Sequence, residues 1–296
     1  MTGIILIIAG FLATTTVLAQ QPDSEILKLM PEIPANISEP AKRAEYLALH
    51  YWDNFDFGDM ASPAEDDLFE RCFVDFIDVL SMVQADKPVY ILMYKAAEAN
   101  PEMLRLAIEL SEKYLYRPES PVYDEEKFIP FLRFALQSDA LDETLKIRPK
   151  FLLDNVMKNR TGHVANDFSY TLTNRDSGTL YGVKTNYTIL FFKDPECEDC
   201  TALAKLLATS STINGLIEQG KMTILTVYTG DDIESWEKHA SEIPASWIYS
   251  FDEAQKIVSE EIYDIKRYPT LYLLDKDKKV LLKDVGLQKI EEYIAQ

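Results

Sequence analysis

One stretch of this chain, residues 187–200, constrains its fold more than any other. An uncharged apolar run, Tyr187–Phe192, is followed by a four-residue turn and then by the cysteine pair Cys197 and Cys200. The apolar run predicts a buried strand, and the turn and cysteine spacing predict a helix that begins at the pair. With two residues between them on the first helical turn, the two sulfurs can close a small disulfide ring.

This cysteine spacing has a chemical reason. The sulfur of Cys197 would lie over unpaired backbone N–H groups at the positive end of the helix dipole, which stabilise its thiolate as a nucleophile. The deeper Cys200 could then attack a mixed disulfide and release the substrate. A zinc site is the alternative, but zinc needs about four ligands, and this half of the chain adds only His163 and His239. We therefore expect thiol chemistry without a metal or another cofactor.

The first residues predict export. Residues 3–18 carry no charge, and residues 17–19, Val-Leu-Ala, suit signal peptidase. We therefore expect a signal peptide over residues 1–19, and no stable membrane insertion after its cleavage. An uncleaved membrane anchor is the alternative, although the apolar run is shorter than the ~20 residues that span a bilayer. In an exported protein the cysteines can be oxidised.

Charge and cysteine content narrow the possible functions. The 296 residues include 49 Asp plus Glu against 30 Lys plus Arg, a formal net charge of -19. Such a surface repels nucleic acid and anionic lipid, so we expect neither as a partner. The third cysteine, Cys72, lies on an apolar helical stripe, which favours an inert core thiol over a redox or intermolecular role.

The sequence pattern changes near Arg160. Over residues 22–159 the apolar positions are three and four apart, which predicts an all-α domain. Over residues 160–296 short β-like segments alternate with helices, which predicts an α/β domain with a mixed sheet, and an α+β chain overall. Pro149 is expected to interrupt or offset its helix. The expected helices are residues 38–51, 62–83, 86–99, 100–115, 124–136, 139–158, 201–208, 235–240, 253–258 and 287–294, and the expected strands are residues 168–172, 187–192, 222–228, 247–249, 270–274 and 280–283.

Three separated features of the second half resemble the thioredoxin-like proteins, in particular the exported thiol-disulfide oxidoreductases of the Bacteroides envelope type. The features are residues 162–168 with 178–181, the turn into Cys197, and the run Tyr268, Pro269, Thr270 before the strand at 271–274. The resemblance covers about residues 162–296.

This resemblance implies the roles of the site residues and their setting. Cys197 and Cys200 would be catalytic, and Tyr268, Pro269 and Thr270 would form a cis-proline loop that binds an extended substrate through its backbone. The partners would be protein thiols or disulfides and a membrane or periplasmic electron donor, in the bacterial periplasm or cell envelope. Residues 46–57 also resemble a helical domain of unassigned function that precedes thioredoxin domains in Bacteroides-type envelope proteins.

The site departs from the family pattern in its charges. Lys193 is the only base near the cysteines, and the field of the surrounding acids opposes a thiolate at Cys197. A less stabilised thiolate makes the reduced form a stronger reductant, so we expect a reductase or isomerase rather than a donor of disulfides. The redox-tuning acids are Asp194, Glu196, Glu198 and Asp199.

The proton relay and the activity itself leave alternatives open. The family's buried acid, six residues before the first cysteine, is replaced by Phe191, which leaves Glu261 or water to relay the proton of Cys200. Fold alone does not confer function, so the main alternative is a non-enzymatic envelope binding module. In that module the helical domain would capture a polypeptide or glycan, and the second domain would be a scaffold with a structural disulfide. A peroxide-reducing enzyme fits less well, because a peroxidatic thiol needs a cationic partner.

Overall fold

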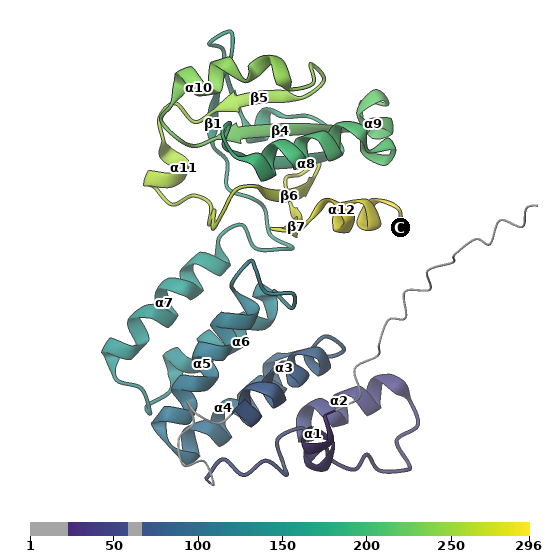
Figure 1. Ribbon diagram of the computed structural model, residues 1–296, viewed down its shortest axis with the longest axis vertical. Helices are drawn as coiled ribbons and strands as arrows, with labels where there is room; N and C mark the ends of the chain where they lie inside the picture. Colours follow the sequence, from purple (N-terminus) through teal and green to yellow (C-terminus); the bar gives the residue numbers. More distant parts are fainter. Residues whose placement is uncertain (1–22, 59–66) are drawn as a thin grey trace, which may run out of the picture. The chain divides into compact units, whose positions relative to one another are not determined.

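The computed structural model describes residues 23–58 and 67–296 (Figure 1). The predicted signal peptide and the expected helix start at residue 62 lie outside these residues. The chain divides into two compact units, Met1–Val83 and Gln84–Gln296. This division lies within the helical segment, and the domain boundary at residues 159–160 stays a prediction.

The first unit contains three described helices around an aromatic core. They are α1 (Ser24–Leu29), α2 (Pro40–His50) and α3 (Asp67–Leu80). Trp52 is buried and contacts the rings of Phe55, Phe57, Phe69 and Phe76. Cys72 is buried on the same face of α3 as Phe69 and Phe76.

Of the first four helices of the second unit, three begin at side-chain caps that the sequence provides, and α4 does not. Asn100 caps α5 and Asp124 caps α6, each accepting a hydrogen bond from the N–H three residues later, at 2.8 and 3.1 Å. Helix α7 starts at Glu143 rather than at residue 139, because Asp142 is its cap. The expected interruption at Pro149 is wrong, because the helix continues through this buried proline. The helices are α4 (Asp86–Ala99), α5 (Pro101–Leu115), α6 (Glu125–Gln137) and α7 (Glu143–Met157).

In the described residues one sheet of seven strands follows, in the order β2-β1-β5-β4-β3-β6-β7. Strand β3 lies in the interior of the sheet, with β4 parallel on one side and β6 antiparallel on the other. The all-α segment followed by a mixed α/β sheet confirms the predicted fold class. The strands are β1 (Ser169–Leu172), β2 (Ser177–Thr179), β3 (Tyr187–Phe192), β4 (Met222–Tyr228), β5 (Ile248–Phe251), β6 (Thr270–Asp275) and β7 (Val280–Lys283).

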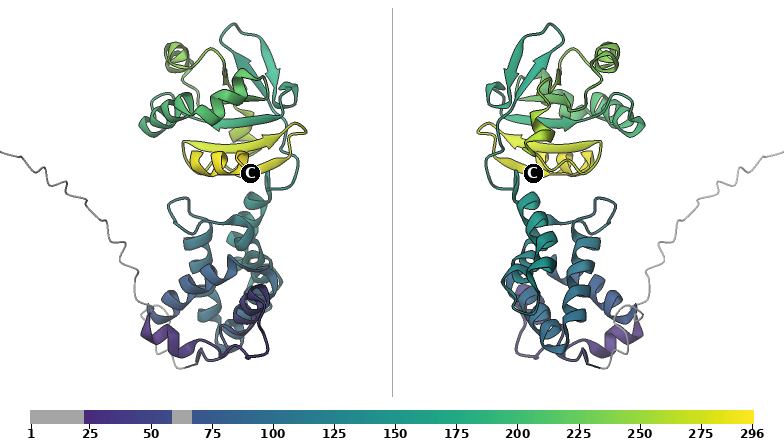
Figure 2. Two further views of the ribbon diagram at one scale, coloured as in Figure 1. Left: turned by 90° about the vertical axis from the view of Figure 1, so that its right-hand side faces the viewer. Right: turned by 90° about the vertical axis from the view of Figure 1, so that its left-hand side faces the viewer.

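Helices cover both faces of this sheet. Helices α8 (Glu198–Thr209) and α12 (Leu287–Ile294) pack on the face that presents Ile189 and Phe191, and α11 (Lys256–Ser259) packs on the opposite face. Figure 2 shows α12 beside the strands β6 and β7. Two further helices, α9 (Ser211–Glu218) and α10 (Ile233–Lys238), complete the second unit. Within the described residues, none of the helices combines the length and the apolar character needed to span a bilayer.

Candidate functional site

The two cysteines lie where the chain passes from strand β3 into helix α8. Cys197 is the N-cap of α8, and its Sγ accepts a hydrogen bond from the backbone N–H of Cys200 at 3.1 Å. The backbone N–H of Cys197 donates to the carbonyl of Asp194 at 3.3 Å, which closes the turn. Cys197 is half-buried and Cys200 is fully buried, and both are free thiols. The outer sulfur can therefore meet a protein substrate, whereas the inner sulfur is shielded from one.

Burial sets the protonation state of the inner cysteine. Burial, followed in size by the hydrogen bond with Cys197, raises the pKa of Cys200 to about 12. At neutral pH Cys200 is therefore a thiol, and it needs help to become the thiolate that attacks a disulfide.

The proline loop lies at the same end of the sheet as the cysteines. The Tyr268–Pro269 peptide bond is cis, and Thr270 begins β6 opposite Phe192, the last residue of β3. Tyr268 packs against the same apolar cluster as Cys197 and Cys200, and its hydroxyl hydrogen-bonds the hydroxyl of Thr229. The side chain of Thr270 donates to the carbonyl of Arg267 at 2.7 Å, which ties the loop to the strand. The loop and the dithiol thus share one apolar cluster.

The four predicted tuning acids differ in exposure. Glu196, Glu198 and Asp199 are exposed, whereas Asp194 is half-buried and its carboxylate accepts the N–H of Glu196 at 2.8 Å. Glu196 also accepts a hydrogen bond from the hydroxyl of Ser235 at 2.8 Å. Solvent and salt screen the field of exposed carboxylates. The acids therefore act on the thiols more weakly than their number suggests.

Lys193 is the site residue whose place the sequence pattern does not reveal. It is only 3% exposed, and burial lowers its pKa, with Cys200 the largest of the opposing electrostatic influences. The signal in the sequence is its position directly after β3, at the end of an apolar run. In contrast Glu261, considered above as a proton relay, is 64% exposed and pairs with Lys158 at 2.9 Å.

No group of three or more His, Cys, Asp and Glu side chains in residues 23–58 and 67–296 is arranged to hold a metal ion. The dithiol at the N-terminus of α8 is therefore the main chemical feature of this end of the sheet.

Comparison with known proteins agrees with this geometry. Residues 185–280 match the thioredoxin-like family, and residues 13–159 match a domain of unknown function, DUF5106. The crystal structure of a thioredoxin-like protein from Bacteroides caccae is 36% identical with a TM-score of 0.85, and the match covers 90% of this chain and 97% of that chain. The chain belongs to the thioredoxin-like proteins. Both resemblances inferred from the sequence, the thioredoxin-like half and the helical domain of unknown function, are confirmed.

Shorter structures match the thioredoxin-like half. The C-terminal domain of an uncharacterized protein from Bacteroides fragilis is 40% identical over 47% of this chain and 99% of that chain, with a TM-score of 0.46. The thioredoxin domain of a thiol-disulfide oxidoreductase from Bacteroides vulgatus is 24% identical over 46% of this chain and 95% of that chain, with a TM-score of 0.41. The comparison with curated proteins finds no match.

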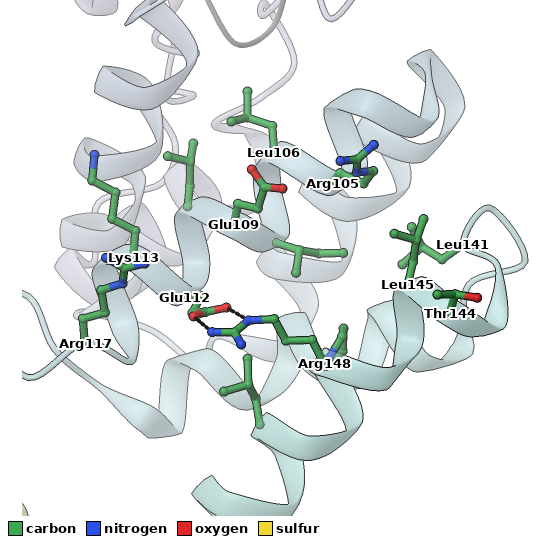
Figure 3. Close-up of a pocket in the computed structure, with 14 residues that line it drawn as sticks. Arg105, Leu106, Glu109, Glu112, Lys113, Arg117, Leu141, Thr144, Leu145 and Arg148 are labelled. Carbon is green, nitrogen blue, oxygen red and sulfur yellow. Dashed lines mark hydrogen bonds and ion pairs between the residues drawn. The ribbon is translucent and has the colours of Figure 1, made fainter. Parts of the chain in front are cut away.

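A second concave site lies between α5 and α7 of this thioredoxin-like protein (Figure 3). The groove has a volume of about 570 Å³, within the range of small-ligand sites. Arg148 of α7 reaches Glu112 of α5 and donates two hydrogen bonds to its carboxylate, one of them 2.8 Å long. Apolar and cationic side chains line the groove together, including Leu106, Leu110, Leu141, Leu145, Leu152, Arg105, Lys113, Arg117 and Arg148.

Proposed function

We propose that this protein is a thiol-disulfide oxidoreductase of the bacterial cell envelope that acts as a reductase or isomerase on protein disulfides. The observation that carries the proposal is the dithiol itself. A half-buried Cys197 caps α8, and its sulfur accepts the N–H of a fully buried Cys200. A helix N-terminus favours negative charge at the outer sulfur. This pairing of a partly accessible nucleophile with a protected resolving thiol is what dithiol exchange requires.

The reaction proceeds in two exchange steps. The Cys197 thiolate attacks one sulfur of the substrate disulfide, and the other substrate sulfur leaves as a thiolate that takes up a proton. Cys200 then loses its proton and attacks the Cys197 sulfur, which forms the Cys197–Cys200 disulfide and releases the second substrate thiol. Two electrons pass from the dithiol to the substrate, so a membrane or periplasmic dithiol donor must reduce the pair again.

The proline loop supplies the substrate contact in this proposal. Tyr268 and Pro269 are half-buried, so part of the loop is open to solvent beside the cysteines. An extended substrate segment would bind to the backbone of Tyr268, Pro269 and Thr270, in the manner of strand addition. Residues 1–19 would direct export, which places the reaction where protein disulfides occur.

The reducing direction is the second part of the proposal. The acids Asp194, Glu196, Glu198 and Asp199 surround Cys197 in the sequence, and their field disfavours a thiolate there. A reduction potential well below that of periplasmic disulfide donors is expected. Equilibration of the pair with glutathione measures it, and a potential near about -120 mV would contradict the reducing role.

An insulin-reduction assay with dithiothreitol as donor tests the activity. Wild type should accelerate precipitation of the insulin B chain, and Cys197→Ser should show only the background rate. Cys72→Ala is the matched control, because it removes a buried thiol of the first unit and should leave turnover unchanged. Cys200→Ser should accumulate the mixed disulfide, visible on a non-reducing gel. Equal, negligible turnover in wild type and Cys197→Ser would refute the enzyme.

The groove between α5 and α7 favours one second function, capture of a polypeptide or glycan by the helical segment. Its lining combines apolar side chains with four cations and two acids, Glu109 and Glu112. Because Arg148 is paired with Glu112, Arg105 and Arg117 are the cations through which an acidic and apolar ligand would bind. Peptide and glycan arrays probed with labelled protein would test this, with Leu145→Glu as the variant that places a charge in the groove. Array binding lost in the variant supports capture, and absence of binding in the wild type refutes it.

A further inference from the structure

Lys193 is a buried lysine at the start of the turn that leads from β3 to the dithiol. It follows the last residue of β3, and its backbone N–H donates to the carbonyl of Val227 at 3.1 Å, so the ladder with β4 fixes its position. Its Nζ lies 5.8 Å from the ring centroid of Tyr249, a distance at which an aromatic face still attracts a cation. Across residues 23–58 and 67–296, no side chain forms a hydrogen bond or ion pair with this Nζ.

The charges that face Lys193 come from several elements. Cys197 and Cys200 act on it from α8, Asp194 from its own loop and Glu242 from the single helical turn Ala240–Glu242. Burial lowers the pKa of Lys193, and Cys200 opposes that shift more than any other group. The influence is reciprocal, because Lys193 lowers the pKa of Cys200 against the effect of burial. A thiolate at Cys200 and an ammonium at Lys193 therefore favour each other.

In the part of the chain that the structure describes, no buried carboxylate is placed to serve Cys200 instead. The family's acid position holds Phe191, which is fully buried in the same apolar cluster as Cys200. The acids that are buried in the described residues are Glu125 and Asp252. Glu125 pairs with lysines, and Asp252 accepts the N–H of Ile257 at 2.7 Å. Among the described residues, Lys193 is the buried lysine whose charge acts on the resolving thiol.

We propose that Lys193 is the positioning residue that stabilises the Cys200 thiolate during the resolving step, in the place where the family uses a carboxylate. Its charge acts on Cys200 as that thiol releases its proton to water and attacks the Cys197 sulfur of the mixed disulfide. The departing substrate thiolate takes up a proton in turn, so the step balances. The inference rests on the proposed function, because it assigns a role within dithiol exchange.

The first test measures the reactivity of Cys200 without requiring turnover. In a Cys72→Ala, Cys197→Ser background Cys200 is the remaining thiol, and its rate of alkylation by iodoacetamide between pH 7 and 10 follows its thiolate fraction. Adding Lys193→Met, which has similar length and no charge, should slow alkylation about tenfold, equivalent to one pKa unit. Lys193→Arg, which keeps the charge, should stay within about threefold of the background.

The outcomes separate a charge effect from a packing effect. Equal rates in the background and in Lys193→Met would overturn the inference, as would equally slow rates in the Met and Arg variants. Should Lys193→Met fail to fold, judged by circular dichroism, Lys193→Gln takes its place.

A second measurement uses the intact pair. Equilibration with glutathione should give Lys193→Met a dithiol–disulfide equilibrium about tenfold more reducing than wild type, which corresponds to about 30 mV. An unchanged potential would contradict the role of Lys193. Insulin turnover by the wild type is measured alongside. If the wild type does not reduce insulin, the proposed enzyme fails, while the alkylation and potential measurements still decide whether Lys193 acts on Cys200.

Discussion

Replacing Glu125 with glutamine should destabilise the second unit more than any surface substitution. Glu125 is the first residue of α6, and its side chain is only 7% exposed. One carboxylate oxygen lies 2.7 Å from Nζ of Lys283, and the other accepts hydrogen bonds from Lys266 and from the hydroxyl of Tyr123. Both lysines come from the thioredoxin-like segment, so this carboxylate joins a helix to the sheet region.

The loss of unfolding free energy in Glu125→Gln depends on which partners Lys266 and Lys283 retain. Glutamine has nearly the same shape but no charge. Lys266 would keep the carboxylate of Asp264 at 3.0 Å, whereas Lys283, 5% exposed, would lose its carboxylate and keep only neutral acceptors, among them the carbonyls of Val156 and Lys158 at 3.3 and 2.9 Å. Leaving one partner of a buried pair without its counter-charge costs about 3–5 kcal/mol. Because two carbonyls remain as acceptors for Lys283, we expect the low end of that range.

Urea unfolding followed by tryptophan fluorescence measures this cost. In a Trp52→Phe background the emission comes from Trp236 and Trp247, both in the second unit, so the signal follows that unit. Glu143→Gln is the matched control, because Glu143 is 92% exposed and pairs with Lys146 at 3.2 Å.

The control should lose less than about 0.5 kcal/mol, as exposed ion pairs do. If Glu125→Gln and Glu143→Gln lowered the free energy of unfolding by the same amount, within about 0.5 kcal/mol, the reasoning from burial would be wrong.

Three further predictions follow from single contacts. Since burial raises the pKa of Cys200 from 9.0 to about 12, its protonated thiol stabilises the reduced fold below pH 9, and this contribution is lost as the pH rises towards 12. The stability difference between reduced wild type and Cys200→Ala should therefore fall by about 1.4 kcal/mol between pH 7 and 10 in urea titrations; a constant difference contradicts this. Asp124→Ala removes the N-cap of α6 and should lower the free energy of unfolding by about 1 kcal/mol in urea titrations. An unchanged free energy of unfolding would contradict this. Gly178→Ala would place a Cβ 2.5 Å from the ring of Tyr170 and should cost about 1–3 kcal/mol, whereas Gly215→Ala, with open space around it inside α9, should stabilise by up to about 1 kcal/mol; the reverse order in thermal melts would contradict both.

The strands that the sequence predicts best are those buried on both faces. The bounds of β3 and β4 agree with the expected residues, because both are continuous apolar or β-branched runs with almost every residue buried. Strand β2 (Ser177–Thr179) has no such run. It forms because Gly178 pairs with Tyr170 of β1 and leaves room for the tyrosine ring. That pairing is a long-range contact, which a local pattern does not contain.

Helix α9 was missed for a related reason. Ser210 ends α8 and is at the same time the N-cap of α9, where its hydroxyl accepts the N–H of Ile213 at 3.2 Å. The two helices therefore follow each other without a loop, and the sequence reads as one longer helix with Gly215 near its end. The chain changes direction at Ser210, and this turn depends on the burial of Ile213 in the cluster that also holds Leu207. Such a tertiary contact is not contained in the local sequence pattern.

The cysteine pair and the proline run could be predicted because their chemistry depends on spacing along the chain, which the sequence contains. The burial of Lys193 could not, because the residue after a strand can point to solvent or inward depending on what covers the sheet end. Here Tyr249 of β5 and the turn at Glu242 surround it.

This burial changes how the charges at the site should be weighed. By number alone, the four acids in the sequence outweigh the one base, Lys193, which predicts a strongly reducing dithiol. Weighed by exposure, Glu198 and Asp199 act through water and salt, where the energy of a charge pair is small. Lys193 acts through the protein interior, where the same charge counts for more. In the proposed mechanism the exposed acids therefore act only weakly on the dithiol, and Lys193 acts on the inner sulfur of Cys200. One substitution at Lys193 should accordingly shift the potential further than neutralising Glu198 and Asp199 together.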